Sequence, residues 1–368
     1  MQLVAYGAQD IYLTGNPQIT FFKVVYRRHT NFAMEAISQT FDGQVSSGCT
    51  VSATISRNGD LVHRVYLEVT SGATKITNAF AVVNQVDLEI GGQLIDRHYG
   101  RWMAVWCELT HSSSKHDQLN RLVSATKAGN TVWVPLQFSF CRNPGLAIPL
   151  IALQYHEVKI NVKFNTLAAD VNVCMYCDYI YLDTDERRRF AQTSHEYLIE
   201  QVQSSLSNCP GSGCNAKIAL HFNHPVKELV WYADDTATRA EWSYNDATQA
   251  IWSKALSGTG LLRLNGHERF TARDHTYFRD VQRYQHHTGA KSVPKILAAP
   301  TSTNHVNVYS FALQPEEHQP SGTCNMSRID NAVLEVSTQA STDSIDIYAV
   351  NYNVLRVMSG MGGLAYSN

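Results

Sequence analysis

The chain has 368 residues, which is enough for two domains that each bury a core of their own. Its 30 basic residues against 32 acidic ones give a net charge of −2, which excludes a general basic field that would gather nucleic acid or an acidic membrane surface. Only 17% of the residues are charged, less than the ~25% usual in soluble domains, and this favours a chain that buries surface against partners. No apolar run reaches the ~18 residues of a membrane helix, and no signal-peptide pattern opens the sequence.

Apolar and polar residues alternate with period two along most of the chain, which predicts strands with one buried face. Turn residues separate these segments, among them the pairs Gly91-Gly92 and Asn265-Gly266. Helical spacing appears at 100–113 and 271–287, and 144–154 is expected to hold at most a short helical turn, broken by Pro149. Strands are expected in the first half at 50–55, 61–69, 131–140, 155–164 and 173–182, and in the second at 196–203, 216–222, 226–233, 260–266, 306–313, 332–338 and 345–358.

The two halves repeat each other. Gly92 and Gly266 each follow a strand and precede an aromatic helical segment, and they lie 174 positions apart. Val132 and Val306, which open the next strand in each half, have the same separation. A repeat of this length predicts two tandem domains of one architecture rather than a solenoid. We place the joint in the polar stretch 182–195, giving domains 1–188 and 189–368. Gly92 and Gly266 are expected at tight turns with an unusual φ.

The stretch 309–333 gathers several reactive side chain types, including Glu316, Glu317, His318 and Arg328. Paired carboxylates can perform acid–base chemistry. Adjacent loop residues point apart, however, and no partner base is near in the sequence. Ser327 is expected to cap a short helical turn. We interpret the stretch as a loop that holds a shape and makes contacts, with Glu316, Glu317, His318 and Arg328 as its candidate contact residues.

The cysteines offer weak metal-site patterns. We read all eight as small buried hydrophobes of a reducing compartment rather than as disulfides. Cys174 and Cys177 lie three apart on a strand and so face opposite sides. A second set could meet only if its loop folds back onto the next strand; it comprises Cys209, Cys214, His221 and His224.

No catalytic cluster emerges from the remaining motifs. There is no nucleophile elbow, no phosphate-binding loop and no dinucleotide fingerprint. The glycine-rich end, 359–368, reads as a flexible tail rather than a phosphate cradle. The sequence therefore predicts an all-β protein of two sandwiches that is not an enzyme and holds no cofactor or metal.

Five long stretches resemble the major capsid proteins of nucleocytoplasmic large DNA viruses, the double jelly-roll family. They span the chain from first residue to last: 2–33, 91–102, 140–162, 309–331 and 347–368. The resemblance implies two tandem eight-stranded jelly rolls with a few short helices in loops. It also implies a homotrimeric capsomer of hexagonal outline that tiles an icosahedral shell.

The resemblance further implies assembly in the host cytoplasm and residence in the virion. The N-terminal segment would face inward, towards minor capsid proteins and the internal membrane, and no sequence-specific contact with nucleic acid is implied. Short connections such as 56–60 and 167–172 suggest a flatter outer surface than in longer members. Two alternatives remain at this point: a minor capsid paralogue, or a glycan- or receptor-binding β-sandwich that uses the loop 241–246.

Overall fold

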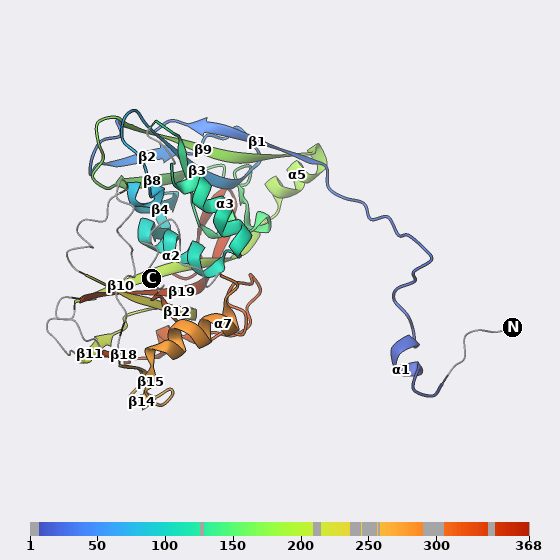
Figure 1. Ribbon diagram of the computed structural model, residues 1–368. Helices are drawn as coiled ribbons and strands as arrows, with labels where there is room; N and C mark the ends of the chain where they lie inside the picture. Colours follow the sequence, from blue (N-terminus) through green and yellow to red (C-terminus); the bar gives the residue numbers. More distant parts are fainter. Residues whose placement is uncertain are drawn as a thin grey trace.

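The structure is a computed structural model, and it describes residues 7–125, 129–208, 215–235, 244, 256, 258–289, 305–337 and 343–367. Most of these residues form strands, arranged as two β-sandwiches (Figure 1). We call strands β1 to β9 the N-terminal roll and strands β10 to β20 the C-terminal roll. The predicted all-β fold of two tandem jelly rolls is confirmed.

The N-terminal roll consists of two packed antiparallel sheets. The larger has the order β1-β9-β3-β6, and the short β7 shares the β3 edge with β6, so the two sheets offer eight strand positions. The smaller has the order β2-β8-β4-β5. Their bounds are β1 Phe32–Gln39, β9 Val171–Leu182, β3 Leu61–Ser71, β6 Val132–Pro135, β7 Ile148–Pro149, β2 Thr50–Thr54, β8 Val158–Phe164, β4 Val83–Ile90 and β5 Gln93–Tyr99.

The C-terminal roll repeats this order strand for strand. Its larger sheet runs β10-β19-β12-β16, with β17 also on β12 and β20 on β19, and its smaller sheet runs β11-β18-β13-β14, with β15 also on β13. The repeat seen in the sequence is therefore a repeat of topology. The bounds are β10 His195–Asn208, β19 Asp343–Met358, β12 Pro225–Asp235, β16 Asn307–Ser310, β17 Cys324–Asn325, β20 Met361–Leu364, β11 Asn215–Ala219, β18 Ala332–Ser337, β13 Thr259–Leu264, β14 His267–Glu268 and β15 Arg273–Asp274.

Helices occupy the connections. The predicted helix at 100–113 is α2, and the segment 271–287 holds β15, a π-helical turn η3 and α7. The expected strand 131–140 ends at Pro135, and helix α4 follows it. The polar stretch between the rolls forms α5, whose first amide is capped by the side chain of Asp183. The helix bounds are α1 Ile11–Thr14, η1 Ala79–Val82, α2 Gly100–Thr110, α3 Ser113–Val123, α4 Ser139–Arg142, η2 Pro144–Leu146, α5 Thr184–Gln192, η3 Tyr277–Val281, α7 Gln282–His286 and η4 Met326–Arg328.

The period-two pattern places every second side chain in a core, as in β8, where buried residues alternate with half-buried or exposed ones. One hydrophobic cluster fills the N-terminal roll and continues into the outer face of β12 and β19. A second cluster fills the C-terminal roll. The larger sheet of the C-terminal roll is thus buried on both faces, which makes the contact between the two rolls part of the folded core.

Two local expectations are wrong. The glycine-rich end is not a free tail, because β20 pairs with β19 and residues 360 and 364 bond to the N-terminal roll: Tyr155 N donates to Gly360 O at 2.9 Å, and Leu364 N donates to the Gln93 side chain at 3.2 Å. The cap of η4 is Asn325, whose side chain accepts from Ser327 N at 3.1 Å. The Ser327 hydroxyl instead accepts from His224 N, a contact across the loop that only the tertiary structure supplies.

Gly92 and Gly266 both have φ of +80°, in the turns β4–β5 and β13–β14. A Cβ at either position would meet nothing within 4 Å, so the cost of a side chain comes from the backbone conformation. We expect Gly92→Val or Gly266→Val to lower the free energy of unfolding by about 1–2 kcal/mol, since a left-handed conformation costs that much for an L-residue. Denaturation midpoints measure this, and unchanged midpoints would contradict the turn requirement.

Candidate functional site at the joint between the rolls

The joint between the two rolls is built around α2. Gly100, which begins the helix, follows β5 directly, and the helix lies against the outer face of the C-terminal roll's larger sheet. Trp102 is 2% exposed, and its ring centroid lies 4.9 Å from that of Tyr348 on β19 and 5.6 Å from that of Trp106. The Trp102–Tyr348 contact packs one roll directly against the other.

A buried chain of charges crosses the same joint. Lys227 has no exposed surface, and its Nζ lies 2.7 Å from Glu200 Oε1. Arg142 of α4 in the N-terminal roll reaches the other oxygen of Glu200 at 3.0 Å and lies over the Trp106 ring. A β-bulge in β12 between Val226 and Glu228 shifts the register there. Because of the bulge, the side chains of Lys227 and Glu228, which are consecutive along β12, both lie in the joint.

The chain of charges continues through His287. Its Nε2 lies 3.0 Å from Glu228 Oε2, and its Nδ1 lies 3.0 Å from Glu316 Oε1. Glu316 also accepts from Thr288, at 2.9 Å from the amide and 2.7 Å from the hydroxyl. Since both ring nitrogens face carboxylates, the imidazolium form satisfies the site best. The Thr288 hydroxyl contacts Thr110 O as well, which ties this group to the end of α2.

The pKa values follow from this geometry. Burial would lower the pKa of His287, but the carboxylates of Glu228 and Glu316 outweigh it and raise the pKa to about 9. Burial would raise the pKa of Glu316, but the hydrogen bonds from His287 and Thr288 hold it below its usual value. Burial lowers the pKa of Lys227 despite the neighbouring carboxylates of Glu200 and Glu228. Perturbed groups of this kind also mark active sites, but here each one has a partner in the joint.

The His287 site predicts a loss of stability at alkaline pH. Because the folded-state pKa of about 9 lies above the ordinary value of 6.5, the stabilisation is complete below about pH 6.5 and is lost as the pH rises through about 9. This difference between the folded-state and ordinary pKa of His287 corresponds to about 3 kcal/mol of the free energy of unfolding. Urea unfolding at pH 6.5 and 9.5 measures it. In His287→Gln the drop between these two pH values should largely disappear, and an equal drop in the variant would show that another group causes it.

Two further buried ion pairs join the rolls. Arg101 of α2 pairs with Asp234 of β12. Arg283 of α7 pairs with Glu108 of α2 at 3.0 Å and also donates to the Glu108 carbonyl at 3.1 Å. Both pairs connect residues more than 130 positions apart. The joint therefore has ionic contacts at both ends of α2, in addition to its aromatic centre.

The loop 311–331 joins β16 to β18, and 136–157 joins β6 to β8 at the same place in the other roll. Of the candidate contact residues, only Glu316 enters the joint. Glu317 is exposed, His318 is half-buried, and Arg328 is exposed on η4. Glu316, Glu317 and His318 line a cleft of about 780 Å³ whose other wall is formed by α3 and α4. The structure does not bring Arg328 to this cleft.

The cysteine and histidine set is not assembled among the described residues. Cys209 and Cys214 lie outside them, while His221 is exposed and His224 is buried with φ of +64°. Cys177 is buried and Cys174 half-buried on opposite faces of β9, as expected. Within the described part of the chain, no three His, Cys, Asp or Glu side chains meet in a way that could hold a metal ion.

The loop 241–246, considered for glycan binding, lies outside the described residues except for Tyr244. That side chain is buried in the N-terminal roll. Its carbonyl accepts from the amides of Thr77 and Asn78, and its hydroxyl accepts from Ala168 N at 2.9 Å. Tyr244 is therefore a contact between the rolls and not part of an exposed aromatic pocket.

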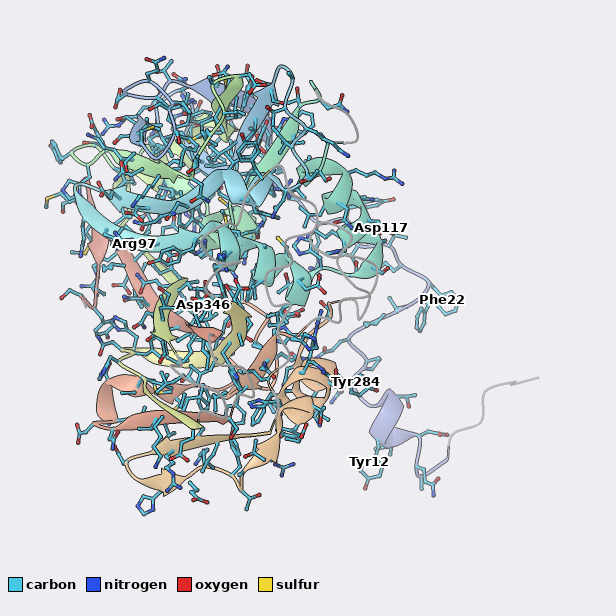
Figure 2. The ribbon with its side chains drawn as sticks, turned by 60° about the vertical axis from the view of Figure 1, so that its left-hand side comes forward. Tyr12, Phe22, Arg97, Asp117, Tyr284 and Asp346 are labelled. Atoms are coloured by element: carbon cyan, nitrogen blue, oxygen red, sulfur yellow. The ribbon has the colours of Figure 1, made fainter. Side chains whose placement is uncertain are left out.

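The N-terminal segment 7–31 extends away from both rolls (Figures 1 and 2). Tyr12 and Phe22, labelled in Figure 2, project from it into open space, and Phe22 is 97% exposed. Its basic residues are Lys23, Arg27 and Arg28. Large exposed apolar side chains on an extended segment mark an interaction site. No helix of the described residues is long and apolar enough to cross a membrane.

Sequence reasoning missed Lys227, His287 and Glu200 as a group. A signal was present: Lys227 and Glu228 interrupt an otherwise apolar strand, and buried charges require partners. Their partners could not be named because each comes from a different element. Figure 2 shows another residue of this kind, Asp346 on β19, which is buried in the C-terminal roll near the joint.

Comparison with known families gives two adjoining matches. A family described as major capsid protein N-terminus matches residues 20–183, and one described as large eukaryotic DNA virus major capsid protein matches 186–363. The major capsid protein of Pyramimonas orientalis virus is 52% identical over all of this chain and 99% of that protein. That of Paramecium bursaria Chlorella virus 1 is 41% identical, with the same coverage.

Solved structures give the same picture. The capsid protein VP54 of PBCV-1, fitted into a reconstruction of the virophage Sputnik, superposes with a TM-score of 0.84 at 36% identity, covering 95% of this chain and all of that one. The quasi-atomic model of the PBCV-1 virus capsid superposes with a TM-score of 0.82 at 36% identity, covering 95% of this chain and all of that one. The Faustovirus major capsid protein, at 12% identity and a TM-score of 0.74, shares the fold over 96% of this chain and 94% of its own.

Proposed function

Because this chain belongs to the family of large eukaryotic DNA virus major capsid proteins, whose members form the capsid shell, we propose that three copies associate into a capsomer. The observation that carries the proposal is the full-length match to capsid proteins together with the repeat of one roll topology. Three chains with two similar rolls each would place six similar rolls around a threefold axis. Such a unit has a hexagonal outline and can tile a closed shell.

The rigid joint supports this role. A capsomer keeps its outline only if the two rolls of each chain hold a fixed relative position. The Trp102–Tyr348 contact, the buried pair of Lys227 with Glu200, and the His287 site all lie between the rolls. These buried groups bind each other across the joint, as a structural role requires.

The segment 7–31 serves, in this proposal, as the contact with partners at the inner face of the shell. Minor capsid proteins and the internal membrane are the partners that the family resemblance implies. The exposed aromatic residues Phe21 and Phe22 beside Lys23, Arg27 and Arg28 suit an apolar surface with acidic groups. Assembly would take place in the host cytoplasm, before the shell closes.

The native mass of the purified chain tests the capsomer. Light scattering on a sizing column should give about three times 41.1 kDa, stable on dilution. Permanent assemblies bury over ~2,000 Å², so dilution into the nanomolar range should not release monomers. A folded monomer under all conditions would contradict the trimer and favour a minor capsid role.

Contacts between capsomers should be weaker than contacts within one. We expect assembled shells in rising salt to release trimers before monomers, because polar contacts between exposed charges are screened and buried apolar ones are not. Native mass measurements across a salt series, from about 0.1 M to 1 M, follow the released species. Monomers that appear ahead of trimers would overturn this order.

A further inference from the structure

Thr30, at the end of the N-terminal segment, is preceded by two arginines. Arg27 and Arg28 stand three and two positions before it, and no other serine or threonine of the chain has arginine at both of these positions. Protein kinases select their substrates by charge patterns. A pair of arginines at these two positions is the pattern that arginine-directed serine/threonine kinases bind.

The structure leaves Thr30 open to such an enzyme. Residues 23–31 form no helix, strand or turn, and every one of them is exposed. Figure 1 shows this part of the chain leaving the start of β1 as an extended thread, clear of both rolls. The Thr30 hydroxyl makes no hydrogen bond within the described part of the chain. An acceptor residue has to enter the cleft of a kinase in extended form, and here no folded element has to unfold first.

Three other hydroxyl residues follow an arginine by three positions, but the fold holds each of them. Ser124 is half-buried at the end of α3. Thr276 lies in a helical turn, and its amide donates to the Asp274 side chain at 2.8 Å. Ser359 has a φ of +52° in the tight turn between β19 and β20. The tertiary structure therefore selects Thr30 among the four.

Basic residues lie around Thr30 from two parts of the chain. The guanidinium groups of Arg27 and Arg28 have no acidic partner among the residues that the structure describes. Strand β1 begins two residues after Thr30, beside the end of β9 where α5 starts, as Figure 1 shows. Helix α5 carries the exposed Arg188 and Arg189. A phosphate at Thr30 would have these cations as neighbours, and guanidinium groups bind phosphate through charge-assisted hydrogen bonds.

We propose that Thr30 is a phosphorylation site for an arginine-directed serine/threonine kinase that uses ATP. The Thr30 hydroxyl oxygen attacks the γ-phosphorus of ATP. The bond from that phosphorus to the oxygen that bridges it to the β-phosphate breaks, and ADP leaves. The hydroxyl proton passes to the catalytic aspartate of the kinase. The enzyme acts on the chain before assembly, because it needs access to residues 27–30.

Phosphorylation of Thr30 would cancel the charge of the N-terminal segment. Three basic residues against the single acidic Asp10 give residues 7–31 a charge of +2. A phosphate adds about −1.5 to −2 at pH 7. The proposed function has this segment contact surfaces with acidic groups, so the modified chain would bind them less well. This consequence rests on the proposed function, whereas the modification itself does not.

Phosphoryl transfer to the full chain tests the site. The purified chain is incubated with the catalytic subunit of cAMP-dependent protein kinase and Mg²⁺-ATP, and tandem mass spectrometry locates the phosphate. We expect it at Thr30 and expect Thr30→Val to abolish it. Arg28→Gln should lower kcat/KM roughly tenfold or more, the effect of losing one charge-assisted contact. Arg273→Gln, the matched control before Thr276, should leave the rate unchanged.

Two results would overturn the assignment. One is equal incorporation of phosphate by the wild type and Thr30→Val. The other concerns the unassembled chain isolated from infected cells, in which the same mapping should find phosphate at Thr30. A chain that is unmodified there would refute the site even if the purified chain accepts phosphate.

Vesicle binding separates the consequence from the modification. On vesicles that contain phosphatidylserine, the phosphorylated chain should bind roughly 30-fold more weakly, because the phosphate offsets about two basic residues. Vesicles of phosphatidylcholine alone are the control and should not distinguish the two forms. If the unmodified chain binds neither vesicle, the membrane contact of the proposed function fails and the phosphorylation site stands. If it binds and phosphorylation changes nothing, the charge effect assigned to the phosphate is overturned.

Discussion

Lys227→Met should cost about 3–5 kcal/mol of the free energy of unfolding, the range found when one partner of a buried ion pair is removed. Methionine keeps the length of the side chain but removes the ammonium group. Glu200 then keeps its ion pair with Arg142 but loses the one with Lys227, while Glu228 keeps its pair with His287. Both carboxylates are buried, so water compensates poorly for the lost charge.

Two controls accompany this variant. Adding Glu200→Gln to Lys227→Met removes the stranded charge and should recover part of the loss, which a double-mutant cycle quantifies. Arg356→Met breaks an exposed ion pair with Glu196, whose partners are about half exposed, and should cost less than about 1 kcal/mol. Urea unfolding at one fixed protein concentration gives the free energy of unfolding of the wild type and of each variant. A Lys227→Met protein as stable as the wild type would refute the importance of the buried pair.

Trp102→Ala should lower the free energy of unfolding by about 3–5 kcal/mol, the cost of removing a large aromatic side chain from a core. The indole is almost fully buried and contacts Tyr348 and Trp106. Its loss leaves a cavity between the rolls, where neither sheet can close the gap without moving the other roll. The trimer yield should therefore fall together with the stability.

The control for this effect is Tyr366→Ala, which removes an exposed aromatic ring near the C-terminus. It should change the stability by no more than about 0.5 kcal/mol. Thermal unfolding and sizing chromatography of both variants provide the comparison. If Trp102→Ala retains the wild-type midpoint and forms trimers normally, the two rolls do not depend on this contact.

The sequence alone determined the fold class and its repeat. Alternation of period two, glycine turns such as Gly92 and Gly266, and equal spacing between matching strands depend on neighbours along the chain, so they can be read without a structure. They indicated two rolls of one topology, which the strand orders reproduce. The shape-holding role predicted for 309–331 stays a prediction, and His287 beside Glu316 is a partner that its sequence did not show.

The tertiary structure decided which residues join the rolls. Glu200, Lys227, His287 and Glu316 come from two strands, the end of a helix and a loop, and nothing in their spacing shows that they meet. The same holds for the glycine-rich end, which became β20 because β19 and the N-terminal roll offer it partners. Local alternation selects strands, whereas burial and pairing between distant elements depend on how the sheets stack, and that stacking has no local signature.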